Sequence, residues 1–264
     1  MRNSKVLAAS GLLLCSLAAG CGTGEKSASV AGNAPQAREA PRAEAPPAAA
    51  IGPAGRLRGT VRFEGPVPPP VRSPVKSFSE CAAQHPEEVF ADDALIRDGK
   101  LQNVFVYVKE GLEGKPVPPP RDPVLVDQVG CLYKPRVLGV QVGQEMMIKN
   151  SDVTLHNVHS HSVNQKPFNF GMPVQGMKVK KIFGAPEVMV KLTCDVHPWM
   201  KSYVGVLPHP YFAVSGADGG FEIPDLPPGK YRIEAWHEKF GTQTQEVTVT
   251  PAETSELSFT FKAD

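Results

Sequence analysis

Residues 188–206 read VMVKLTCDVHPWMKSYVGV, two apolar runs rich in valine on either side of a short polar loop. Short runs of this kind, with β-branched residues and turn-forming residues at their ends, predict buried β-strands. The loop between them carries Cys194, His197 and Met200 at intervals of three residues. Because such a short loop keeps its side chains close together, the stretch predicts a hairpin whose tip presents a cluster of potential metal ligands.

The same kind of strand recurs along most of the chain. Proline and glycine, 27 and 24 of the 264 residues, punctuate short β-branched and aromatic runs, and no longer window has the period typical of an amphipathic helix. We therefore expect an all-β fold, organised as two sandwich-like units. The predicted strands are Leu57–Glu64, Val104–Val108, Val124–Val129, Val137–Val142, Glu145–Lys149, Val188–Leu192, Ser202–Val206, Tyr231–Trp236, Thr244–Thr250 and Leu257–Phe261.

The charge balance of the chain argues against nucleic acid as a partner. Lys and Arg number 28 and Asp and Glu number 27, so the net charge is +1 at pH 7. This balance excludes the broad basic field of a nucleic-acid-binding protein and also an acidic solvating tail. Hydrophobic residues make up 41% of the chain, which is enough for a packed core.

The first residues resemble the export signal of a bacterial lipoprotein. Arg2 and Lys5 precede an apolar stretch that is too short for a transmembrane helix, and small residues lead directly into Cys21. We therefore expect residues 1–20 to be a signal peptide and Cys21 to carry the lipid that anchors the chain to a bacterial membrane. The chain would then be exported to the cell envelope or periplasm. An ordinary signal peptide followed by an incidental cysteine is the alternative.

Residues 21–55 are rich in alanine and proline and contain no aromatic residue. A segment of this composition buries too little apolar surface to offset the entropy lost on ordering. We expect a disordered tether, with the folded part of the chain beginning at about residue 56.

Two turn motifs near the C-terminal end resemble the carboxypeptidase regulatory-like, or prealbumin-like, β-sandwich. Asp218-Gly219 is a hairpin-turn dipeptide, and the run PPGKY that ends at Tyr231 combines a rigid reversal with the start of a strand. The opening strands of that family resemble residues 57–61 and 103–108, far upstream in this chain.

This separation implies a divided domain. The resemblance places the regulatory-like sandwich at 56–120 and 208–264, with a second domain inserted at 121–207. Two domains in series are the alternative.

A further histidine supports metal chemistry in the inserted segment. His156 begins the run HNVH, which follows the predicted strand ending at Lys149. A thiolate and two imidazoles, with a thioether bound more weakly, accept both Cu(I) and Cu(II) with little rearrangement. Taken alone, Cys194 and His197 could be half of a zinc site. Together with His156 and Met200, they point to copper and to electron transfer.

HNVH followed by Cys-x2-His-Pro-x-Met resembles the cupredoxins, in particular the plastocyanin and amicyanin branch. The resemblance implies a Greek-key β-sandwich that holds one type 1 copper per chain. His156, Cys194 and His197 would be its strong ligands and Met200 the weak axial ligand. Asn157 matches the asparagine whose hydrogen bonds tie the two ligand segments together in that family.

Related redox classes fit the motifs less well. The loop has one cysteine where a binuclear copper centre needs two, and the chain has no CxxC motif for a thioredoxin-like or haem site. His159 and His161 form the only HxH motif, which is too little for a multicopper oxidase or a copper nitrite reductase. Since no nucleophile–base pair is evident either, we expect no enzymatic activity. The remaining histidines, expected to be structural, are His85, His209 and His237.

The resemblance also bears on the other cysteines. The chain has five, of which Cys15 lies in the expected signal peptide and Cys21 would carry lipid. Once Cys194 is assigned to copper, Cys81 and Cys131 remain. In an oxidising compartment we expect them to form a disulfide that joins the outer segment to the inserted domain.

The function implied by the resemblance is that of a membrane-tethered blue-copper electron carrier. Its partners would be other redox proteins, such as a cytochrome c, a dehydrogenase or an oxidase, and only the lipid anchor would touch a membrane. Two alternatives are a periplasmic copper chaperone or store, and an interaction module with a vestigial copper site.

In cupredoxins, electrons leave through the histidine of the copper loop. We therefore expect one edge of the His197 ring at the surface, and weak, transient docking of partners there because the chain is nearly neutral. The residues expected to form an apolar patch around this edge are Phe168, Phe170, Met172, Pro173, Pro198 and Trp199.

Overall fold

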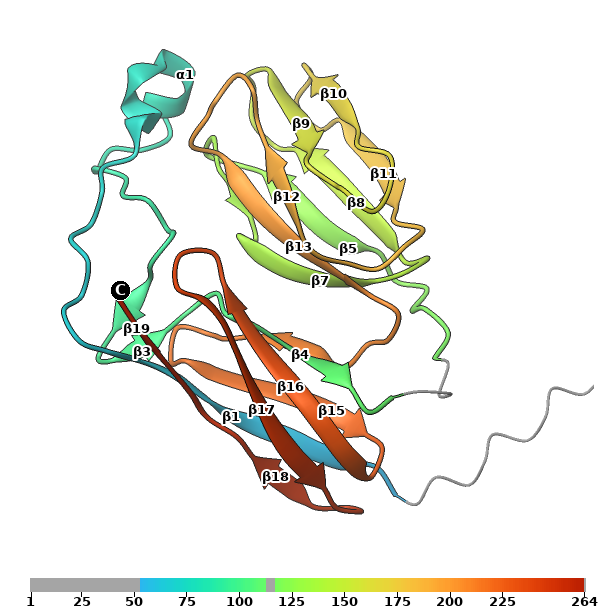
Figure 1. Cartoon of the computed structure of the whole chain (residues 1–264). Helices are drawn as coiled ribbons and strands as arrows, with labels where there is room; N and C mark the ends of the chain where they lie inside the picture. Colours follow the sequence, from blue (N-terminus) through green and yellow to red (C-terminus); the bar gives the residue numbers. More distant parts are fainter. Residues whose placement is uncertain (1–52, 113–116, 264) are drawn as a thin grey trace, which may run out of the picture. The chain divides into compact units, whose positions relative to one another are not determined.

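The computed structural model describes residues 53–112 and 117–263 (Figure 1). The expected signal peptide, Cys21 with its expected lipid, and nearly all of the expected tether lie outside these residues. Within them, no helix has the length and apolar character needed to cross a membrane.

The described residues form strands, with two short helical turns. The turns are η1 (Pro74–Ser77) and α1 (Ser79–Ala82). The strands are β1 (Gly55–Glu64), β2 (Ile96–Arg97), β3 (Lys100–Leu101), β4 (Phe105–Glu110), β5 (Val124–Gln128), β6 (Tyr133–Lys134), β7 (Val137–Gln141), β8 (Glu145–Asn150), β9 (His156–Ser160), β10 (Asn169–Met172), β11 (Lys178–Ile182), β12 (Glu187–Thr193), β13 (Lys201–Leu207), β14 (Phe212–Val214), β15 (Gly220–Leu226), β16 (Gly229–His237), β17 (Gly241–Val249), β18 (Thr254–Glu256) and β19 (Phe259–Lys262). The all-β prediction is confirmed.

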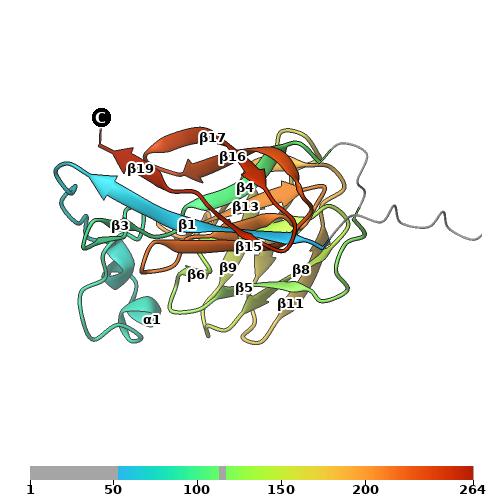
Figure 2. The same cartoon turned by 90° about the horizontal axis from the view of Figure 1, so that it is seen from below.

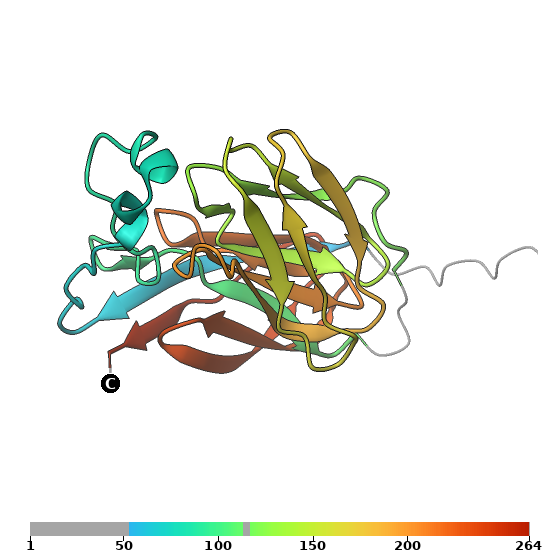
Figure 3. The same cartoon turned by 90° about the horizontal axis from the view of Figure 1, so that it is seen from above.

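One sandwich is built entirely from β5 to β13, the green, yellow and orange strands seen from above in Figure 3. Its sheets have the strand orders β10-β9-β12-β13-β7 and β11-β8-β5-β6. Val126 and Ile148 of the second sheet share one buried cluster with Val158, Val190 and Val204 of the first. This core supports the strands that carry the predicted ligands.

The other sandwich combines strands from both ends of the described chain. β1 pairs with β15 on one side and with β18 and β19 on the other. Figure 2 shows β1 from below together with β15 and β19. The facing sheet has the order β14-β4-β16-β17. The core between these two sheets contains Leu57, Val61, Val106, Ile223 and Ile233. Strands that precede and follow residues 124–207 in the sequence therefore complete one another's hydrogen bonding.

Each predicted strand is present, with ends that differ by a few residues. Most of the strands that the sequence pattern missed are short or polar, with the seven-residue β15 as the exception, and β9 is the most important of them. Its sequence, HNVHS, lacks apolar alternation, but it is held between β10 and β12 in the first sandwich. Pairing with neighbours, rather than intrinsic propensity, makes this segment a strand.

Gly59 of β1 provides a test of the second sandwich. A β-carbon at this position would overlap the backbone carbonyl oxygen of Leu257, which side-chain movement cannot relieve. We expect Gly59→Ala to lower the free energy of unfolding by about 3 kcal/mol, measured by urea denaturation. Gly184→Ala is the matched control, because a β-carbon there meets no atom within 4 Å. Equal stability of the two variants would contradict the packing of the chain after β18 against β1.

Candidate metal centre

Two segments bring the predicted strong ligands together. His156 begins β9, and the loop that carries Cys194 and His197 joins β12 to β13. β12 and β9 pair antiparallel with Thr193 opposite His159. This register places the start of β9 beside the loop that follows β12, so that a strand end and a loop meet at one edge of the core.

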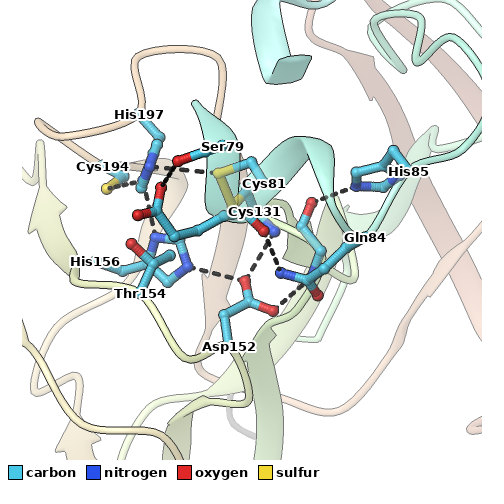
Figure 4. Close-up of a disulfide and its surroundings, with 12 residues drawn as sticks. Ser79, Cys81, Gln84, His85, Cys131, Asp152, Thr154, His156, Cys194 and His197 are labelled. Carbon is cyan, nitrogen blue, oxygen red and sulfur yellow. Dashed lines mark hydrogen bonds and ion pairs between the residues drawn. A yellow bond between two sulfur atoms is a disulfide. The ribbon is translucent and has the colours of Figure 1, made fainter. Parts of the chain in front are cut away.

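The side chains of this edge point their donor atoms toward one another (Figure 4). His156 Nδ1 lies 2.9 Å from His197 Nδ1, and Cys194 Sγ lies 3.8 Å from the same nitrogen. The three residues offer one sulfur and two nitrogens that all lie within 4.8 Å of one another, and each residue is at most 1% exposed. The structure therefore assembles the thiol and both imidazoles that the sequence singled out.

Met200 closes the loop through its backbone. Its N–H donates to the carbonyl oxygen of His197, and its own carbonyl accepts from the N–H of Cys194. The Met200 side chain is fully buried in the same cluster as Cys194. A loop closed by two such bonds leaves its side chains little freedom.

Asn157 joins the two ligand segments. Its side-chain oxygen accepts from the Asp195 N–H at 2.6 Å, and its side-chain nitrogen donates to Asp195 Oδ2 at 2.9 Å. The Asn157 backbone N–H points at Cys194 Sγ, 3.5 Å away. Asn157 therefore connects β9 to the loop that carries Cys194.

The environment of Cys194 favours its thiolate. Burial raises the pKa of Cys194, but hydrogen bonding to His156 and to backbone N–H groups, including that of Asn157, outweighs burial, and the pKa is lowered. A lowered thiol pKa makes the anionic form, which is the metal-binding form, more accessible.

Asp152 is a site residue that the sequence reasoning did not single out. It is 2% exposed, accepts from the N–H groups of Gly130 and Cys131 at 2.8 Å each, and accepts from His156 Nε2 at 2.9 Å. This contact leaves His156 Nδ1 facing His197 Nδ1. Burial lowers the pKa of His156, but Asp152 and Cys194 more than offset that effect and the pKa is raised. The sequence feature that could have pointed to Asp152 is its position four residues before His156, a predicted ligand.

The surroundings of His197 contradict the expectation of an exposed edge. His197 is 1% exposed, because residues 74–85, which we call the strap, cover it. The Phe78 ring lies 4.9 Å from the His197 ring between centroids, and Cys81 Sγ lies 3.5 Å from His197 Nε2. Burial and the nearby His156 lower the pKa of His197 to about 4. The prediction failed because strap and loop are distant in sequence and no local pattern links them.

The predicted apolar patch is only partly exposed, since Pro173 and Pro198 are exposed whereas Phe168, Phe170 and Trp199 are half-buried. Met172 is fully buried, since its pairing opposite His156 points it into the core. Trp199 is half-buried and donates from Nε1 to the carbonyl oxygen of Cys131 at 2.9 Å. Phe168 and Phe170 pack against the core beneath the ammonium group of Lys181.

The cysteines outside the loop form a disulfide between Cys81 of the strap and Cys131. Among the described cysteines, Cys194 alone is free. His159 and His161 stack on each other away from the three donor atoms, with His159 Nδ1 3.1 Å from Asp195 Oδ1.

The donor set fits a copper ion. One thiolate and two imidazoles converge in a buried position, a methionine lies in the same loop, and carboxylate ligands that would favour a harder ion do not take part in this group. His156, Cys194 and His197 could hold the ion, and Met200 lies at the end of the same loop.

Comparisons with known proteins give two kinds of likeness. Residues 206–262 match the model of the carboxypeptidase regulatory-like domain. A search of curated proteins finds no match.

Among solved structures, the chain is similar to a purple cupredoxin from Nitrosopumilus maritimus, with 26% identity over 31% of this chain and 98% of that one, and a TM-score of 0.27. A copper-containing nitrite reductase from Thermus scotoductus has 28% identity and a TM-score of 0.29, but the match covers 35% of this chain and only 25% of the reductase. An amicyanin variant in its Cu(I) form has 22% identity over 32% of this chain and 81% of its own, with a TM-score of 0.29. The chain thus contains a region that matches the carboxypeptidase regulatory-like domain, and its partial structural likenesses are to cupredoxins and a copper nitrite reductase.

Proposed function

We propose that this protein is a one-electron carrier that holds a single copper ion at His156, Cys194 and His197, with Met200 as a weak fourth ligand. The observation that supports the proposal most directly is the convergence of two imidazole nitrogens and one Sγ atom within 4.8 Å in a buried position. When bound there, copper would supply the Cu(I)/Cu(II) couple.

The residues around the ligands would keep the site rigid. Asp152 accepts a hydrogen bond from His156 Nε2, and Asn157 connects β9 to the loop that carries Cys194. Burial of all three ligands excludes water, which would otherwise add a ligand in one oxidation state and lose it in the other. A rigid, dry site changes little on gaining an electron, and that is what an electron carrier requires.

We also propose where the protein acts and with which partners. Export and lipidation at Cys21 would tether the protein to a bacterial membrane from the periplasmic or outer side. Its partners would be redox proteins such as a cytochrome c, a dehydrogenase or an oxidase, and not nucleic acid. We propose electron transfer without substrate turnover, so the protein would not be an enzyme.

The test is the visible spectrum of the copper-loaded protein. Its metal content is measured first, because zinc can occupy the same ligands during expression. With one copper per chain, we expect intense blue or green thiolate-to-Cu(II) absorption that disappears reversibly on addition of one electron per copper. Stoichiometric Cu(II) binding with only weak absorption would contradict the proposal.

A second candidate function, copper storage or delivery, is favoured by one observation. His197, the ligand through which a cupredoxin exchanges electrons, is 1% exposed here. A store would hold Cu(I) tightly and exchange electrons slowly with a soluble redox protein. A carrier would exchange electrons quickly and reversibly, so stopped-flow mixing of the copper(II) form with a reduced cytochrome c separates the two functions.

A further inference from the structure

His197 has a second face that the copper proposal does not use. Its Nδ1 faces His156 and Cys194, whereas its Nε2 lies 3.5 Å from Cys81 Sγ. Cys81, Cys131 and His197 offer two sulfurs and a nitrogen that all lie within 4.8 Å of one another, and all three residues are buried (Figure 4). Thiolates and imidazole are the ligands that soft metal ions prefer.

We propose that reduction of the Cys81–Cys131 disulfide creates a second metal site, which binds Cu(I) and is made of these two thiolates and His197 Nε2. Two thiolates suit Cu(I), which accepts two or three soft ligands. His197 would contact both sites through its two ring nitrogens, losing its N–H proton when both are filled. The disulfide is then the oxidised form of the second site, in which the two sulfur atoms are bonded to each other instead of to a metal ion.

The strap keeps the two sulfur atoms close after the bond is broken. Val75 of the strap is fully buried in the core of the first sandwich. His85 Nε2 lies 2.7 Å from the carbonyl oxygen of Gly130, the residue before Cys131. Phe78 packs on Trp199 at 5.4 Å between ring centroids. These contacts do not depend on the disulfide, so the reduced cysteines should remain neighbours.

The reduction step needs a dithiol reductant. The disulfide bond takes two electrons and two protons and becomes two thiols, while the reductant loses two hydrogens and closes its own disulfide. Each thiol then releases its proton as it binds Cu(I). No electron passes between the two metal sites in this scheme.

The test counts copper ions. The chain carries Cys15→Ser and Cys21→Ser, so that no other thiol competes. It is treated with dithiothreitol or left oxidised, freed of reductant without air, and titrated with Cu(I) against a coloured Cu(I) chelator. We expect one Cu(I) per oxidised chain and two per reduced chain. The paired variant Cys81→Ser/Cys131→Ser should bind one under both conditions.

A second variant separates this inference from the electron-carrier proposal. With Cys194→Ser added, the first site loses its thiolate, and the reduced chain should still bind one Cu(I) with two sulfur ligands by X-ray absorption. His197→Gln should weaken that binding at least ten-fold. This measurement remains informative if the paired serine variant fails to fold.

The inference is overturned if the reduced chain binds no more copper than the oxidised chain, or if the extra ion survives loss of both Cys81 and Cys131. If the oxidised chain binds no copper but the reduced chain gains one ion at these cysteines, the second site stands and the electron-carrier proposal fails.

Discussion

Cys194→Ser is expected to abolish the intense visible absorption of the copper(II)-loaded protein while leaving the fold intact. The absorption requires a thiolate bound to Cu(II), and Cys194 is the only free cysteine among the described residues. Serine occupies nearly the same volume and keeps the backbone bonds of the loop. Far-ultraviolet circular dichroism checks the fold, and the visible spectrum at a measured copper content checks the site.

Met200→Leu is the matched control for this prediction. It changes a second buried residue of the same loop but leaves the thiolate in place, so intense absorption should persist. Loss of the weak thioether should instead shift the reduction potential. An intense band that survives Cys194→Ser would remove this thiolate from the ligand set.

Asp152→Ala is expected to lower the free energy of unfolding by about 3 to 5 kcal/mol and to weaken copper binding about 10- to 100-fold. The stability loss follows because the N–H groups of Gly130 and Cys131, and His156 Nε2, would all lose their buried acceptor. Copper binding should weaken because His156 would no longer be held with Nδ1 toward the other ligands. Urea denaturation and competition with a Cu(II) chelator measure the two effects.

The control is Asp127→Ala on neighbouring β5. Asp127 also accepts a hydrogen bond, from Ser151 Oγ at 2.9 Å, and pairs with Lys149, but it touches none of the predicted ligands. We expect about 1 kcal/mol or less of lost stability and unchanged copper affinity. If both variants bound copper like the parent protein, Asp152 would be structural only.

The sequence predicted the parts of the site that depend on local chain geometry. Cys194, His197 and Met200 are close because a short loop between two strands leaves them no alternative. The strands themselves follow from apolar runs that must be buried on a sheet. The apolar pattern did not predict the polar strand β9. His156, the predicted ligand at its first residue, was found from the motif HNVH instead.

Other features of the site depend on contacts between segments that are distant in the sequence, so the sequence alone did not predict them. The role of Asp152 depends on Gly130 and Cys131, which reach it from another loop. The disulfide partner of Cys81 followed from the family resemblance, whereas the position of that disulfide against His197 did not. Its sulfur and the ring come from residues 116 apart in the sequence.

By itself, then, the sequence determined an all-β chain and the donor atoms of one candidate metal centre, because hydrophobic period and loop length act over a few residues. Only the tertiary structure decided what covers those donors. The strap has no regular period, and its position over His197 results from the disulfide, the burial of Val75 and the packing of Phe78 on Trp199. These contacts between distant segments bury His197, which the local sequence pattern had predicted to be partly exposed.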